Sequence, residues 1–355
     1  MHKQPLSLLK SLIATPTPSG WELPGQRLIA DYVKPYADSV RLDVHGNLHA
    51  VLNPDAPVRV MLDGHCDEIG LIVQYVDERG FVFVNPIGGI NIQLLPGERI
   101  VFQGPKGVVK GVIGRKPIHM MDTAERTKGV EKISDLWVDI GASSKKEALA
   151  ALPIGTPGVV DSGWNDLLGD RVSARAFDDR VGAVIVMDVL RRLKGKKLNV
   201  AVHVVSATQE ELGLLGSQTA AYAINPHAGI AVDVTFASDD PTGQPRRIGE
   251  VELGAGPVVA IGPSYDKGLG ERLLTAAEKG KIPVQPHVNP RANGTDSYAM
   301  RLTQAGVANA LVSVPLRYMH SAVETLSLAD VENSSQLIAD TIAAMPKGIT
   351  FGPKL

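Results

Sequence analysis

Six residues whose side chains suit metal binding or acid–base chemistry lie at or near the ends of expected strands, and a seventh lies just before an expected helix. His65 and Asp67 follow the apolar run 59–62, and His320 follows the run 310–319. The others come near the ends of two further apolar runs or just before an expected helix, and they are Asp178, Glu210, Glu211 and Asp233. Because functional sites in α/β sheets gather outside the carboxyl ends of the strands, we expect these side chains to meet.

Each of these residues has an ordinary structural explanation when it is taken alone. A His-x-Asp pair is common in loops, adjacent glutamates often begin a solvated helix, and Asp178 with Asp179 would cap a helix. Asp233 is harder to explain, because a carboxylate buried in an apolar strand requires a cation or hydrogen-bond donors. The convergence of five residues of metal-ligand type at one sheet edge favours a shared metal site.

The combination of residue types indicates which ions the site would bind. Two histidines and three carboxylates suit Zn²⁺, Co²⁺ or Mn²⁺. Cys66 is the only cysteine, so no thiolate cluster restricts the site to zinc. Three carboxylates leave two divalent ions with a net charge of about +1, which a bound hydroxide neutralises. The sequence therefore predicts a centre that activates water.

The elements that position these residues follow two different patterns. Residues 5–37 predict two amphipathic helices, and from about residue 170 strands alternate with helices, which predicts an α/β fold with a mostly parallel sheet. Residues 72–165 are β-rich, with a predicted hairpin around the turn 77–80 and one short helix after Ser144, where Ser144 and Glu147 fit a capping box. We therefore expect a catalytic domain of residues 1–71 and 166–355, split by a β-rich insert at 72–165.

Composition excludes several classes of partner. The chain has 355 residues, and its formal net charge of -2 gives no reason to expect nucleic acid or an acidic membrane surface as partner. The N-terminal apolar stretch is too short and too amphipathic for a signal peptide, and no window approaches a membrane span. With a single cysteine, a reducing compartment is the natural expectation, so we predict a cytoplasmic protein.

Six segments together resemble the M42 family of metallo-aminopeptidases, also called glutamyl or tetrahedral aminopeptidases. They run in the family's order over nearly the whole chain, and they are strongly specific as a set although no single one is. The segments are 63–70 (Asp-Gly-His-Cys-Asp-Glu-Ile-Gly), 177–182 (Phe-Asp-Asp-Arg-Val-Gly), 208–213 (Thr-Gln-Glu-Glu-Leu-Gly), 232–235 (Val-Asp-Val-Thr), 293–296 (Asn-Gly-Thr-Asp) and 320–324 (His-Ser-Ala-Val-Glu).

The resemblance implies a role for each residue of the site. Asp178 would bridge two metal ions, His65 and Asp233 would complete one site, and Glu211 and His320 would complete the other. Glu210 would be the general base, and Asp67 would orient His65 without binding metal. Asp179 and Arg180 would give local support, whereas Cys66 is expected to be a buried, inert thiol.

The resemblance also implies the architecture and the assembly. Family members combine an α/β sandwich of the zinc-peptidase type with an inserted PDZ-like β domain, which fits the β-rich residues 72–165. They assemble through this insert into dimers and then into dodecamers. Polar residues of the insert are expected to be surface or loop groups, and they include His119, Asp122 and Glu125.

We therefore expect a dinuclear aminopeptidase that releases N-terminal residues from short peptides, with water activated by Glu210. Three alternatives remain open at this point. A related carboxypeptidase or deacylase uses similar metal sites but carries its extra domain later in the chain. A glycoside hydrolase needs two carboxylates free to flank a sugar, whereas most here are expected to bind metal. A non-catalytic peptide-binding or assembly protein would have no use for Glu210.

Overall fold

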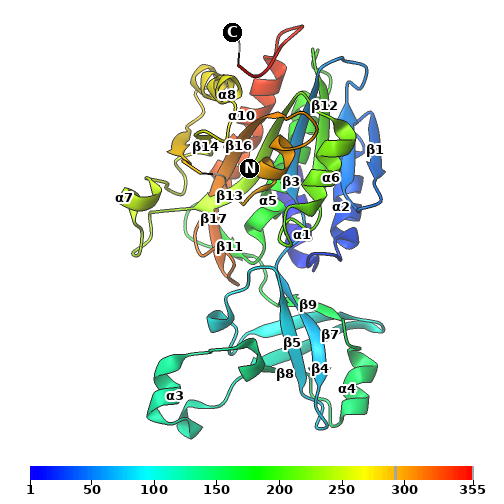
Figure 1. Ribbon diagram of the computed structural model, residues 1–355, viewed down its shortest axis with the longest axis vertical. Coiled ribbons are helices and arrows are strands. Elements are labelled where there is room, and N and C mark those ends of the chain that lie inside the picture. The colour runs from blue at the N-terminus through cyan, green and yellow to red at the C-terminus, as the bar shows by residue number, and fades with distance from the viewer. Residues whose placement is uncertain (292–293, 354–355) are drawn as a thin grey trace.

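The computed structural model describes residues 1–291 and 294–353, and it has two parts (Figure 1). The upper part in Figure 1 is a large sheet covered by helices, and the lower part is a small β-barrel. Asn293, from one of the segments that carry the family resemblance, lies outside the described residues.

The large sheet has eight strands, whose order is β1 (Ser39–Leu42), β2 (Leu48–Leu52), β12 (Ala201–Ala207), β3 (Arg59–His65), β13 (Ala228–Phe236), β16 (Ala308–Leu316), β14 (Val258–Ile261) and β15 (Gln285–Val288). The four central strands, β12, β3, β13 and β16, are mutually parallel. On either side of them, β2 and β14 join the sheet antiparallel. The sheet is thus mixed, and the expected parallel order holds at its centre. A short β1–β2 hairpin can only be antiparallel, which explains part of the difference.

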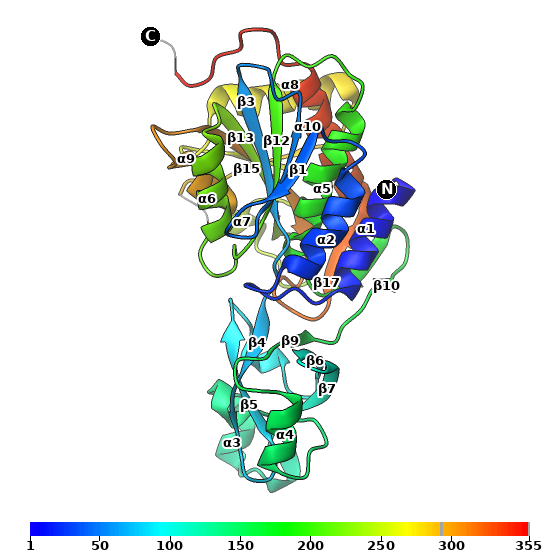
Figure 2. The same ribbon diagram turned by 90° about the vertical axis from the view of Figure 1, so that its right-hand side faces the viewer.

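Helices cover both faces of this sheet (Figure 2). One face carries α1 (Lys3–Ala14), α2 (Leu23–Val33), α5 (Phe177–Leu193), α8 (Lys267–Gly280) and α10 (Leu328–Ala343). The other carries α6 (Leu215–Ile224) and α9 (Asp296–Arg301). Side chains alternate between the two faces, so that Leu62 of β3 packs in the first core and Met61 in the second. The short helix α7 (Pro245–Ile248) lies on a segment that projects from the body of the protein (Figure 1).

The barrel is closed by six antiparallel strands, in the order β4 (Gly70–Val76), β5 (Val82–Ile87), β8 (Trp137–Asp139), β7 (Gly107–Gly114), β6 (Arg99–Gly104) and β9 (Pro157–Val160). It has its own hydrophobic core, centred on side chains such as Leu71, Ile100 and Phe102. The predicted hairpin is confirmed as the pair β4–β5. The connections between the barrel strands contain short helices, which are η1 (Ile92–Leu94), η2 (Ile118–Met120), α3 (Thr123–Lys128), η3 (Ile133–Asp135) and α4 (Lys145–Ala151).

Two short helices of the barrel test the expectations for its polar residues. Ser144 caps α4 as expected, but the Glu147 carboxylate accepts the Ser143 N–H, so the capping box is only half formed. Asp122 and Glu125 form a full capping box at α3, which the sequence analysis did not predict. Asp122 is exposed and Glu125 is partly exposed, in agreement with their expected surface role.

A three-stranded sheet lies between the barrel and the large sheet in the chain's connections. It consists of β10 (Asn165–Asp166), β11 (Arg171–Ala174) and β17 (Glu324–Ser327). β11 leads directly into α5, and β17 follows the loop that contains His320. Among the described residues, no helix combines the length and the apolar composition needed to cross a bilayer.

Candidate metal centre

Five separate segments bring their polar side chains to one edge of the large sheet. His65 is the last residue of β3, Asp233 lies on β13, and Asp178 lies at the start of α5. Glu211 comes from the loop after β12, and His320 from the loop after β16. These residues form two groups that could each hold a metal ion, one of His65, Asp178 and Asp233 and one of Asp178, Glu211 and His320. In each group the ligand atoms lie within 4.8 Å of one another, and Asp178 belongs to both.

Asp178 lies between the two histidines. Its Oδ1 is 3.4 Å from Nε2 of His65, and its Oδ2 is 3.2 Å from Nε2 of His320. Glu211 Oε1 is 3.3 Å from the same nitrogen of His320. Glu210 Oε2 is 3.6 Å from His65 Nε2 but belongs to neither group. The two oxygens of Asp178 therefore point to two different sites, as a bridging carboxylate requires.

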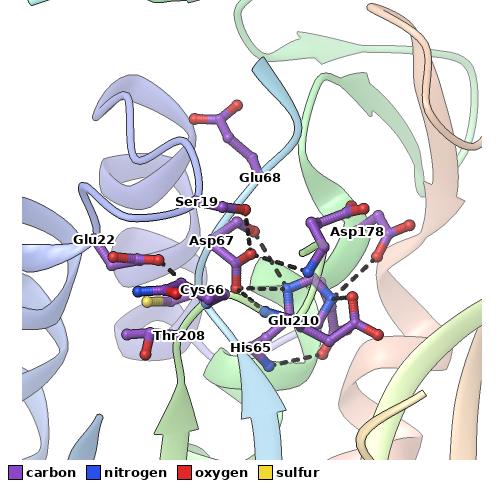
Figure 3. A network of polar contacts seen from close by, with 12 residues as sticks. Ser19, Glu22, His65, Cys66, Asp67, Glu68, Asp178, Thr208 and Glu210 are labelled. Atoms are coloured by element: carbon purple, nitrogen blue, oxygen red, sulfur yellow. Dashed lines mark hydrogen bonds and ion pairs between the residues drawn. The ribbon is translucent and has the colours of Figure 1, made fainter. Parts of the chain in front are cut away.

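Asp67 belongs to a network of polar contacts with Ser19 and His65 (Figure 3). This fully buried carboxylate lies 3.4 Å from Nδ1 of His65 through Oδ1. It also accepts the backbone N–H groups of Glu210, at 3.1 Å, and of Glu211, at 3.2 Å. The hydroxyl of Ser19 donates to it at 2.5 Å. A single carboxylate thus fixes one histidine and the loop that carries both glutamates.

Two further carboxylates hold the backbone of the ligand-bearing segments. Asp179 accepts the N–H of His65 at 3.2 Å and that of Gly182 at 3.0 Å, so Asp179 caps the helix and Asp178 is left free to face the site. Glu324 accepts the N–H of Asp178 at 3.1 Å and that of His320 at 2.9 Å. The sequence analysis assigned no role to Glu324 or to Ser19.

The electrostatics of the site show a strong excess of negative charge. Burial raises the pKa of Glu210 to about 9 and that of Asp233 to about 7, and the neighbouring Asp178 carboxylate adds to both shifts. Hydrogen bonds to Asp178 and Glu211 raise the pKa of His320 to about 11. Without a cation, these groups therefore retain protons near neutral pH. The donor set fits divalent ions, since metal binding replaces protons on such ligands.

The centre opens onto a cleft. A cavity of about 500 Å³ is lined by the carboxylates of Asp178, Glu210, Glu211 and Asp233 and by His320, and its other walls are largely apolar. Cys66 is fully buried, as expected, and burial raises its thiol pKa, which disfavours the reactive thiolate. The cleft thus exposes the ligands and Glu210 to an incoming molecule.

Comparison with known proteins identifies the family. The model for M42 glutamyl aminopeptidases matches residues 46–337. The chain belongs to the M42 family of aminopeptidases. It is 38% identical over 350 residues to the lysyl aminopeptidase of Pyrococcus furiosus, covering 98% of this chain and 99% of the relative. It is also 27% identical to the glutamyl aminopeptidase of Lactococcus lactis, with 81% of each chain covered.

Solved structures agree with this assignment. An aminopeptidase from the archaeon Desulfurococcus kamchatkensis superposes with a TM-score of 0.89 at 35% identity, covering 97% of this chain and 96% of that one. The TET1 peptidase of Pyrococcus horikoshii, described as able to form a tetrahedron or a large octahedral shell, gives 0.85 at 33% identity, covering 96% of this chain and all of that one.

Membership of the M42 family makes the chain a peptidase of the exopeptidase class, and the non-enzyme alternative is thereby removed. M42 enzymes are metal-dependent, which agrees with the two ligand groups at the sheet edge. One similar structure, from Thermotoga maritima, is described as an endoglucanase and is 28% identical with a TM-score of 0.76. Glycosidase activity therefore belongs among the alternatives that an experiment must separate.

Proposed function

We propose that this M42 enzyme binds two divalent ions per chain and removes N-terminal residues from short peptides. Asp178 would bridge the ions, with His65 and Asp233 on one side and Glu211 and His320 on the other. Zn²⁺ or Co²⁺ fits this mixture of imidazoles and carboxylates best, and Mn²⁺ is also compatible with it. The observation that carries the proposal is the sharing of Asp178 between two adjacent ligand groups.

Glu210 is the proposed general base. When bound, two divalent ions lower the pKa of a water molecule and polarise the scissile carbonyl. Glu210 lines the cleft beside both ligand groups and belongs to neither, so its carboxylate is free to accept a proton from the water. It then passes that proton to the leaving amine as the peptide bond breaks. Asp67 keeps Glu210 in place through the backbone N–H.

We propose further that residues 72–165 are a docking unit, of the PDZ-like type that the resemblance implies, and that they join copies of this chain into dimers and dodecamers. The catalytic domain would then be residues 1–71 and 166–355. Support comes from the TET1 peptidase, whose described assemblies are a tetrahedron and a large octahedral shell. In a closed shell with inward-facing sites, the substrates would be short, unfolded peptides with a free N-terminus.

Chelation followed by metal addition tests the proposed chemistry. We expect exhaustive chelation to abolish activity. Added Co²⁺ or Zn²⁺ should restore activity, which should reach its maximum at two metal ions per chain. Mass spectrometry of a short peptide should show stepwise loss from the N-terminus, and an N-acetylated copy should resist. Full activity of a protein confirmed to be metal-free would disprove the proposal. Trimming from the C-terminus would favour a carboxypeptidase. Release of sugar from a cellulose derivative would favour a glycosidase.

A further inference from the structure

The turn of Gly88 and Gly89, between β5 and η1 of the barrel, contacts the metal centre. We propose that this turn positions the Glu211 and His320 half of the metal centre, so that the barrel takes part in metal binding as well as in any docking. The inference rests on the proposed function, because it requires metal ions at that half. Gly89 is a positioning residue here, since its backbone carbonyl acts through His320.

The contact is a hydrogen bond at the ring of His320. Nδ1 of His320 lies 2.7 Å from the carbonyl oxygen of Gly89. A carbonyl can only accept, so Nδ1 carries a proton, and the proton that the imidazolium loses when a metal ion binds must be the one on Nε2. Nε2 is the nitrogen that faces Asp178 and Glu211. The Gly89 carbonyl therefore selects the tautomer and the ring orientation that a metal ion at this half needs.

The ring of His320 depends on this bond because its own segment gives it little support. His320 lies in the loop between β16 and β17, and its side chain is 32% exposed, against 2% for His65. Its backbone N–H is held by Glu324, but that bond does not fix the ring. The two histidines thus differ, since His65 is oriented by Asp67, just after β3, whereas His320 is oriented from the barrel.

Glycine at both positions permits the close approach. A Cβ at Gly89 would lie 3.2 Å from Nδ1 and 3.3 Å from Cε1 of His320. A Cβ at Gly88 would lie 2.9 Å from the side chain of Ile69 and 3.3 Å from Cβ of Glu211, and Gly88 also has a φ of +75°. Side chains at these positions would push against Glu211 and His320. Ile90, which follows the turn, and Leu94 of η1 line a pocket of about 130 Å³ beside His320.

The test is Gly89→Ala, which keeps the carbonyl but displaces the ring. Gly163→Ala is the matched control, because a Cβ there meets nothing within 4 Å and its backbone is not in the left-handed region. Calorimetric titration of the metal-free proteins with Co²⁺ should resolve two sites. We expect one site of Gly89→Ala to weaken by about 10- to 100-fold, as for other groups that orient a ligating histidine, with the other site unchanged. The visible spectrum of the second bound Co²⁺ should change, and excess metal should restore kcat.

Two further measurements make the outcome decisive. In a protein that already carries His320→Ala, Gly89→Ala should cause no further loss of metal affinity, because its effect passes through the His320 ring. A crystal structure of the metal-loaded wild-type enzyme should show the metal on Nε2 and the Gly89 carbonyl on Nδ1. Unchanged metal affinities in Gly89→Ala, additive losses in the double variant, or metal on Nδ1 would overturn the inference. A wild-type protein that binds no metal would instead overturn the proposed function.

Discussion

Asp67 accepts the backbone N–H of Glu210 at 3.1 Å, so a carboxylate that follows β3 fixes the loop that follows β12. The same carboxylate accepts the N–H of Glu211 and the hydroxyl of Ser19. Its burial would raise its pKa, but His65 and these donors outweigh that effect and hold the pKa below its ordinary value. Asp67 therefore stays ionised and accepts only.

This arrangement predicts that Asp67→Asn strongly weakens metal binding or activity. The substitution keeps the side-chain shape, but it places an amide NH₂ group, which donates, next to backbone N–H groups, which also donate. We expect metal affinity at the His65 half, or activity, to fall by about 10- to 100-fold. Ser19→Ala is the control, because it removes one of these hydrogen bonds and leaves the carboxylate, and it should have a much smaller effect. Metal titration and kcat would be compared for both variants. Equal effects would show that Asp67 acts mainly through Ser19.

The adjacent glutamates should have separable phenotypes. Glu210→Gln removes the proposed proton acceptor and preserves its shape, so we expect both metal ions to remain and kcat to fall by about 10²- to 10⁴-fold. Glu211→Gln removes a ligand, so one metal ion should be lost. Metal content by mass spectrometry, together with kcat at saturating metal, measures both. Reversed phenotypes would mean that the two roles are exchanged.

Asp233 should make the metal-free protein less stable at alkaline pH. Burial raises its pKa from 3.8 to about 7, with a further contribution from Asp178. The folded state then binds this proton more tightly than the unfolded state, so the stabilisation is present below about pH 4 and is lost as pH rises to about 7. In chelator at pH 8, Asp233→Asn should therefore be more stable than wild type by on the order of a few kcal/mol.

Denaturant titrations at pH 5 and pH 8 would measure this difference, which should be smaller at pH 5. Added Co²⁺ should reverse the order at pH 8, because only the wild type retains the ligand. If the metal-free proteins were equally stable at pH 8, the Asp233 carboxylate would have to be compensated by the protein itself.

Assembly can be tested independently of chemistry. Light scattering of the native protein should give a mass well above the 37.7 kDa of one chain. A folded globular protein should stay intact while a short peptide is trimmed, since the proposed shell admits only chains that can thread an opening. A stable monomer, or internal cuts in the folded protein, would contradict the proposed docking role of residues 72–165.

The sequence could predict the residues around the centre because each expected strand is an apolar run, and a polar residue near the end of such a run stands out. His65 ends β3 and Asp233 lies on β13, and parallel strands at the centre of the sheet bring these positions to one edge. The adjacent carboxylates Asp178 and Asp179 were ambiguous by sequence, since either could cap a helix. Tertiary contacts resolve them, because Asp179 bonds Gly182 and His65.

Other features of the molecule had no local signal. Glu324 holds the segments of Asp178 and His320 through their backbone N–H groups. Neither the residue type nor its spacing in the sequence predicts such a contact. The bond between His320 and Gly89 joins positions 231 residues apart through a backbone carbonyl. The mixture of parallel and antiparallel strands likewise depends on the edge of the sheet that each outer strand joins. The local pattern of apolar residues does not determine that edge.

The proposed ligands are spread along the chain from His65 to His320, and the last of them takes its orientation from the barrel. During synthesis, a chain that has not yet reached residue 320 has at most one half of the centre, whatever part of it has already folded. A chain on the ribosome would therefore complete the proposed two-ion centre only when nearly all of it has been made.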